Sequence, residues 1–174
     1  MNKMHHGIIV YDSEKYSYHK DFVLIIQSLF HQFGCQTLLK DKKQGNFLKA
    51  IRSMEEQDNF FLVTCDLTGF ELGTETGSLY YNLLHCKMLH FLFGHHESQR
   101  YLKNKLSMSM FFCWLGVPLE EESAILENYP YMEHLHILPN LSWQSFAKTK
   151  EPFSKEQRLL KEEIYFFLKE SFLL

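Results

Sequence analysis

Residues 59–96 decide the fold prediction, and they read NFFLVTCDLTGFELGTETGSLYYNLLHCKMLHFLFGHH. Two short apolar runs, residues 60–65 and 88–93, flank a polar segment that contains three glycines. Each run has the length of a strand and lacks the polar alternation of a strand with one wet face. Such runs are typical of strands that are buried on both faces of a parallel sheet.

Strand-like and helix-like runs alternate along the rest of the chain. The predicted strands are residues 7–11, 35–39, 60–65, 88–93, 108–114 and 134–138, and the predicted helices are residues 21–33, 47–54, 79–86, 97–105 and 120–127. Such alternation is typical of a parallel sheet. We therefore expect one α/β domain over residues 1–174, a Rossmann-like, doubly wound, mostly parallel sheet of about six strands with helices on both faces.

The C-terminal segment predicts one more helix, over residues 154–172. Ser154 and Gln157 have the spacing of a capping box at its start. An apolar stripe follows, formed by Leu159, Leu160, Ile164, Phe167, Leu168 and Phe172. A stripe of this kind has to pack on another surface. We expect that surface to be the domain's own sheet, with a protein partner as the alternative.

Composition and charge exclude several classes of protein. The net charge is −3 and no long basic run is present, which argues against binding to nucleic acid. No segment approaches the length of a membrane span, and the N-terminal apolar run is too short for a signal peptide. The four cysteines form no CxxC pair. We interpret them as buried thiols of a cytoplasmic protein.

The candidate site follows from the two central strands. In open parallel sheets, ligands bind outside the carboxyl ends of the strands. A polar loop follows residues 60–65, and a Gly-His-His sequence follows residues 88–93. The expected ligand-binding residues are Asp66, Gly69, Asn82, His95 and His96. The alternative for Asp66 is a structural one, since Asp often hydrogen-bonds the amides of its own turn.

The motifs of common cofactors are missing from the sequence. The loop glycines Gly69, Gly73 and Gly77 match neither GxGxxG nor a P-loop. The ten histidines contain no HExxH spacing, and no GxSxG elbow is present. We therefore expect no cofactor and no metal, and we assign no catalytic residue. A small hydrolase or transferase that uses Asp66 with His95 or His96 stays open as a further possibility.

Residues 60–140 resemble the N-terminal Rossmann-like domain of bacterial glycosyltransferase-like proteins of the GT-B type. The matching positions are Asp66, Gly69 and Phe70, then Asn82, Tyr129-Pro130 and Leu138-Pro139. The resemblance implies the acceptor-side half of such an enzyme, which would bind a small polar or saccharide ligand. It also implies that the chain needs a second domain or chain for catalysis. The alternative is a protein-interaction module that uses the C-terminal helix or an aromatic surface.

Overall fold

The computed structural model describes residues 4–11, 19–41, 59–64, 87–93, 112–117, 119–128, 135–139 and 155–172. The strands are β1 (His6–Tyr11), β2 (Gln36–Asp41), β3 (Phe60–Thr64), β4 (Lys87–Phe93), β5 (Phe112–Val117) and β6 (Leu135–Pro139). The helices are α1 (His19–Gln32), the 3₁₀ turn η3 (Leu119–Glu121), α6 (Glu122–Asn128) and α8 (Lys155–Phe172). The expected helices over residues 47–54, 79–86 and 97–105 lie outside these residues, as does Ser154.

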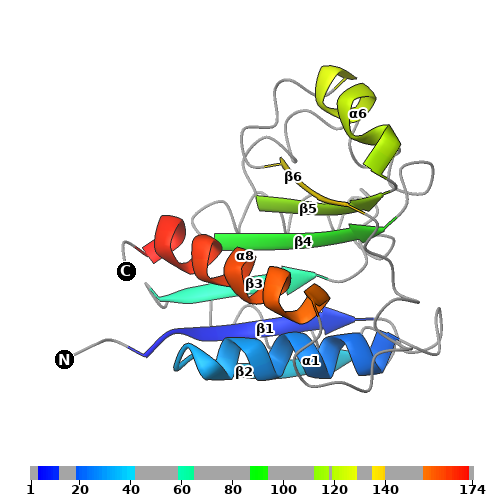
Figure 1. Cartoon of the computed structure of the whole chain (residues 1–174). Helices are drawn as coiled ribbons and strands as arrows, with labels where there is room; N and C mark the ends of the chain where they lie inside the picture. The colour runs from blue at the N-terminus through cyan, green and yellow to red at the C-terminus, as the bar shows by residue number, and fades with distance from the viewer. Residues whose placement is uncertain are drawn as a thin grey trace, which may run out of the picture.

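The strands pair in the order β2-β1-β3-β4-β5-β6, and every neighbouring pair is parallel. The chain therefore runs from β1 outward to β2 and then returns past β1 to β3, so that the strand order reverses at β1. All six carboxyl ends lie at the same edge of the sheet, on the side to which the arrows in Figure 1 point. This edge is the one where the sequence predicted a ligand.

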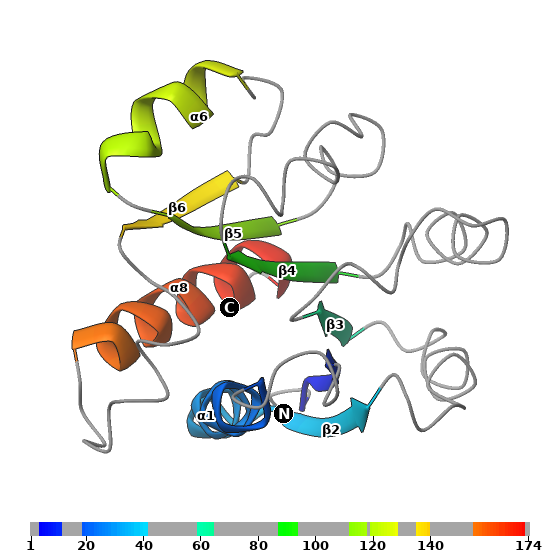
Figure 2. The ribbon, with the colours of Figure 1, turned by 90° about the vertical axis from the view of Figure 1, so that its right-hand side faces the viewer.

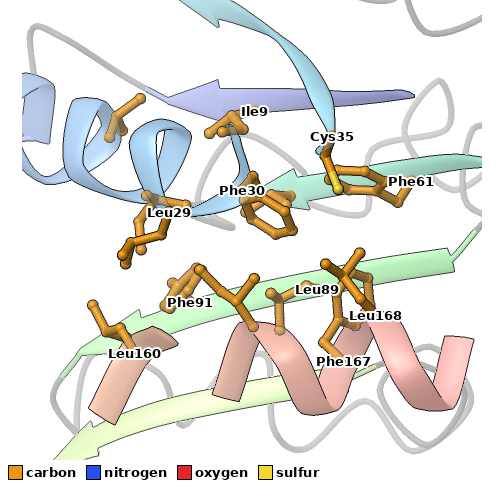
Figure 3. Packing of buried hydrophobic residues seen from close by; sticks show 14 of the residues in the cluster. Ile9, Leu29, Phe30, Cys35, Phe61, Leu89, Phe91, Leu160, Phe167 and Leu168 are labelled. Carbon is orange, nitrogen blue, oxygen red and sulfur yellow. The ribbon is translucent and has the colours of Figure 1, made fainter. Parts of the chain in front are cut away.

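Helices α1 and α8 cover the same face of the sheet, as Figure 2 shows. Their buried side chains form one core with the sheet: Ile9, Phe22, Val23, Ile26, Leu29, Phe30, Cys35, Phe61, Val63, Leu89, Phe91, Leu160, Ile164, Phe167 and Leu168. Figure 3 shows this packing, in which Phe30 and Phe61 stack with 4.8 Å between their ring centroids. The stripe on α8 therefore packs on this chain's own sheet and is not available to a partner.

The end of α1 shows how the sequence directs the chain from helix into strand. Gly34 has a positive φ of 75°. The Cys35 N–H donates to the Phe30 carbonyl at 3.2 Å, and the Gly34 N–H donates to the His31 carbonyl at 3.0 Å. These two bonds form a Schellman motif, in which the position with positive φ is most often occupied by glycine. Cys35 and Phe30 both lie in the core, so the turn sets α1 against the sheet.

The predicted doubly wound, Rossmann-like domain with helices on both faces of a six-stranded sheet is wrong for the structure as described. Among the side chains that the structure describes, the core takes its strand residues from β1, β3 and β4, so the described packed part of the sheet is smaller than predicted. The two long helices share one face, and α6 lies beyond β6 (Figures 1 and 2). The physical reason is that alternation predicts the order of elements but does not select the face on which each helix packs.

Candidate functional site

The five predicted ligand-binding residues, Asp66, Gly69, Asn82, His95 and His96, lie outside the residues that the structure describes. The strands that precede them are described. β3 ends at Thr64 and β4 ends at Phe93, and the two strands are parallel neighbours. The chain therefore leaves both strands at the same edge of the sheet. Whether these five residues form a site stays a prediction.

The described part of this edge contains a polar pair that the sequence reasoning missed. Tyr11 is the last residue of β1 and Asp41 is the last residue of β2, and the two are register partners. The Asp41 side chain faces the interior, with an exposed fraction of 7%. Tyr11 is partly buried and packs against the edge of the core. The available signal in the sequence was that each strand ends in a residue that can hydrogen-bond, at the edge where ligands bind.

The electrostatics of the pair favour a protonated tyrosine. Burial raises the pKa of Tyr11 above its ordinary value of 10.0, and the negative charge of Asp41 raises it further. The phenol therefore keeps its proton at neutral pH and can donate a hydrogen bond. The carboxylate of Asp41 can accept one. A donor and an acceptor on adjacent strands are complementary to a hydroxyl-bearing ligand.

Two described histidines hydrogen-bond other side chains, and both join a helix to a strand. His31 of α1 lies with its Nε2 atom 3.0 Å from the Thr37 hydroxyl of β2. His136 of β6 lies with its Nδ1 atom 2.8 Å from a Glu163 carboxylate oxygen of α8. The Phe166 ring is tilted against His136, with the two centroids 5.0 Å apart. Both contacts tie helices to strands away from the carboxyl edge.

The groups needed for metal or thiol chemistry do not converge in the described parts of the chain. Among those residues, no three His, Cys, Asp or Glu side chains are placed to hold a metal ion. Burial raises the pKa of the Cys35 thiol to about 11. The thiol is therefore protonated at neutral pH and is a poor nucleophile. The expectation for Cys65, Cys86 and Cys113 stays a prediction, because no structural observation bears on it.

The described helices also bear on the membrane prediction. None of them combines the length and the apolar character that crossing a bilayer requires. The longest, α8, carries charged side chains along its exposed face, including Lys161, Glu162 and Lys169. The cytoplasmic location stays a prediction.

Comparisons with known proteins place this chain in no family. No protein-family model, no curated protein and no solved structure matches it.

Proposed function

We propose that this chain binds a small polar ligand, with saccharides as the first class to test, at the carboxyl edge of β1, β2 and β3. The observation that supports the proposal is the Tyr11–Asp41 pair, which lies at the ends of β1 and β2, where the strand order reverses. In open sheets, the crevice outside such a reversal is the usual ligand site. Asp66, Gly69, Asn82, His95 and His96 remain the proposed contributors from the segments that follow β3 and β4.

The charge of the pair favours one class of ligand over another. The charge of Asp41 acts on the neighbouring phenol and raises the pKa of Tyr11, and a negative charge at this place disfavours a phosphate group beside it. A ligand hydroxyl, in contrast, can donate to Asp41 and accept from the Tyr11 phenol. The proposal therefore favours a neutral hydroxyl-bearing ligand, such as a simple saccharide, over a free nucleotide.

The resemblance to the acceptor-side half of GT-B glycosyltransferases supports the same ligand class. On this proposal, the chain holds an acceptor sugar, and a second domain or chain supplies any donor site. The protein-interaction alternative has less support, because Leu160, Ile164 and Leu168 of the α8 stripe are buried in the chain's own core. Among the described large apolar side chains of α8, Tyr165 and Phe166 are the exposed ones.

A thermal-shift screen with saccharides, nucleotide sugars and free nucleotides tests this proposal. A ligand that binds only the folded state stabilises it by about 2.7 kcal/mol when present at a hundred times its dissociation constant. We expect saccharides to raise the melting temperature and free nucleotides to leave it unchanged. Tyr11→Phe removes one hydroxyl and should reduce the saccharide shift.

The matched control is Tyr165→Phe, which removes the same hydroxyl from a side chain that is 51% exposed on α8. This variant should keep the full shift. Asp66→Ala then tests whether the segment after β3 contributes. A flat screen on a well-folded protein, or an equal loss of the shift in Tyr165→Phe, would overturn the proposal.

A further inference from the structure

Among the described strands, β2 is the last one on its side of the sheet, next to β1 (Figure 1). An edge strand presents unpaired main-chain groups, which can pair with a strand of another molecule. In a parallel ladder, alternate residues direct their main chain toward the neighbouring strand. Gln36 directs its N–H at the His5 carbonyl of the chain leading into β1, at 2.9 Å. The alternation therefore turns the main chain of Thr37 toward the open edge.

A side chain from α1 occupies this outward carbonyl. The Gln27 Nε2 group donates to the Thr37 main-chain oxygen at 3.1 Å. His31, one helical turn further along α1, lies with its Nε2 atom 3.0 Å from the Thr37 hydroxyl. The Thr37 side chain is buried under this helix. Two residues of α1 thus engage both the side chain and the main chain of one edge residue.

The same part of β2 would otherwise favour pairing with a second molecule. Leu38 is next to Thr37 and has an exposed fraction of 52%, so an apolar side chain flanks the edge. The first four residues of β2, Gln36 to Leu39, carry no charge, whereas the strand ends in Lys40 and Asp41. Charged residues discourage pairing at a sheet edge. The uncharged half of β2 lacks this protection and is the half that Gln27 contacts.

We propose that Gln27 protects this edge: its amide occupies the acceptor that a further strand would need and so prevents pairing with β2 of a second copy of this chain. His31 acts as a positioning residue that holds Thr37 beneath α1. The partner that is excluded is another β2, because two identical edges can pair about a twofold axis and bring two Leu38 side chains together. This inference does not depend on the proposed ligand site.

The test compares Gln27→Met with wild type by sedimentation velocity over a wide range of protein concentration, with reductant present. Met keeps the length and packing of Gln but cannot donate a hydrogen bond. We expect wild type to sediment as one chain and Gln27→Met to shift to twice that mass as the concentration rises. In the dimer, the amides of Thr37 and Leu39 should exchange more slowly with deuterium than in the monomer.

A second variant separates this role from general stability. Gln32→Met makes the same chemical change at an exposed position near the end of α1, and it should remain monomeric. The proposal is overturned if Gln27→Met stays monomeric at every concentration, or if Gln32→Met dimerises equally. If Gln27→Met proves too unstable to study, Gln27→Leu, which cannot donate and adds no charge, replaces it and should dimerise in the same way.

Discussion

The two ends of strand β1 differ in their side chains and in the contacts that they make. Its amino end packs against aromatic rings: the Gly7 backbone lies against the Phe61 ring, and the preceding His5 stacks on Phe172 of α8 with 4.3 Å between the centroids. Its carboxyl end is polar, with Tyr11 beside the buried Asp41. One strand thus anchors a helix at one end and presents hydrogen-bonding groups at the other. The first role concerns stability and the second concerns the proposed ligand.

The largest expected effect concerns the amino end of β1. A Cβ atom at position 7 would collide with the Phe61 ring, which is buried against Phe30 and Phe167. Because this ring has no free space to move into, we expect Gly7→Ala to lower the free energy of unfolding by about 1–3 kcal/mol. Urea denaturation followed by circular dichroism measures the change.

A double-mutant cycle identifies the cause. Phe61→Leu should relieve the collision, so the two substitutions together should destabilise less than the sum of their separate effects, by about 0.5–3 kcal/mol. Strictly additive effects would show that the collision with the Phe61 ring is not the reason why position 7 needs glycine.

The next largest effect concerns how the stability of the folded chain depends on pH through His5, at the same end of β1. Burial, and then the neighbouring His6, lower the pKa of His5 below its ordinary value of 6.5. The unfolded chain therefore binds a proton at His5 at a higher pH than the folded chain does. Stability from the neutral His5 is present above pH 6.5 and is lost as the pH falls from there through the lower folded pKa.

His5→Phe keeps an aromatic ring against Phe172 but does not titrate. We expect its melting temperature to fall less than that of wild type between pH 7 and pH 5. NMR titration of the His5 ring in wild type should give a pKa below 6.5. A His5 pKa at or above 6.5 would contradict the prediction.

The smallest expected effect concerns the carboxyl end of β1 and is a loss of stability at alkaline pH. The pKa of Tyr11 is raised above 10.0 by burial and by Asp41. Stability from the protonated phenol is therefore present below pH 10 and is lost as the pH rises from there through the higher folded pKa. We expect Tyr11→Phe to lose less stability than wild type above pH 10 in denaturation curves. Tyr165→Phe, which changes an exposed phenol, should behave as wild type does.

The local elements could be predicted from the sequence where apolar runs are long or regular. Helix α1 and helix α8 lie where their stripes predicted, with ends shifted by a few residues. Gly34, which has a positive φ, follows the end of α1. The fifth strand shows the largest shift, from the expected residues 108–114 to Phe112–Val117. Its apolar run is longer than one strand, so hydrophobicity alone does not select which residues enter the ladder.

The candidate site could be predicted only as a location. The carboxyl ends of the central strands were expected to be its position, because parallel strands end at one edge. The Tyr11–Asp41 pair was missed, because the two residues are far apart in sequence and only the register of β1 with β2 brings them together. The same holds for the contact of Gln27 with the Thr37 carbonyl, which depends on how α1 crosses β2.

The order and type of the described elements follow from hydrophobic period and turn residues, which are local properties of the chain. Three features instead depend on how the elements pack: the face that α1 and α8 share, the strands that supply the described core, and the side chain that occupies the outer carbonyl of β2. These outcomes depend on burial between segments that are distant in sequence. The free energy of such burial is shared by both partners, and no pattern within one segment specifies it.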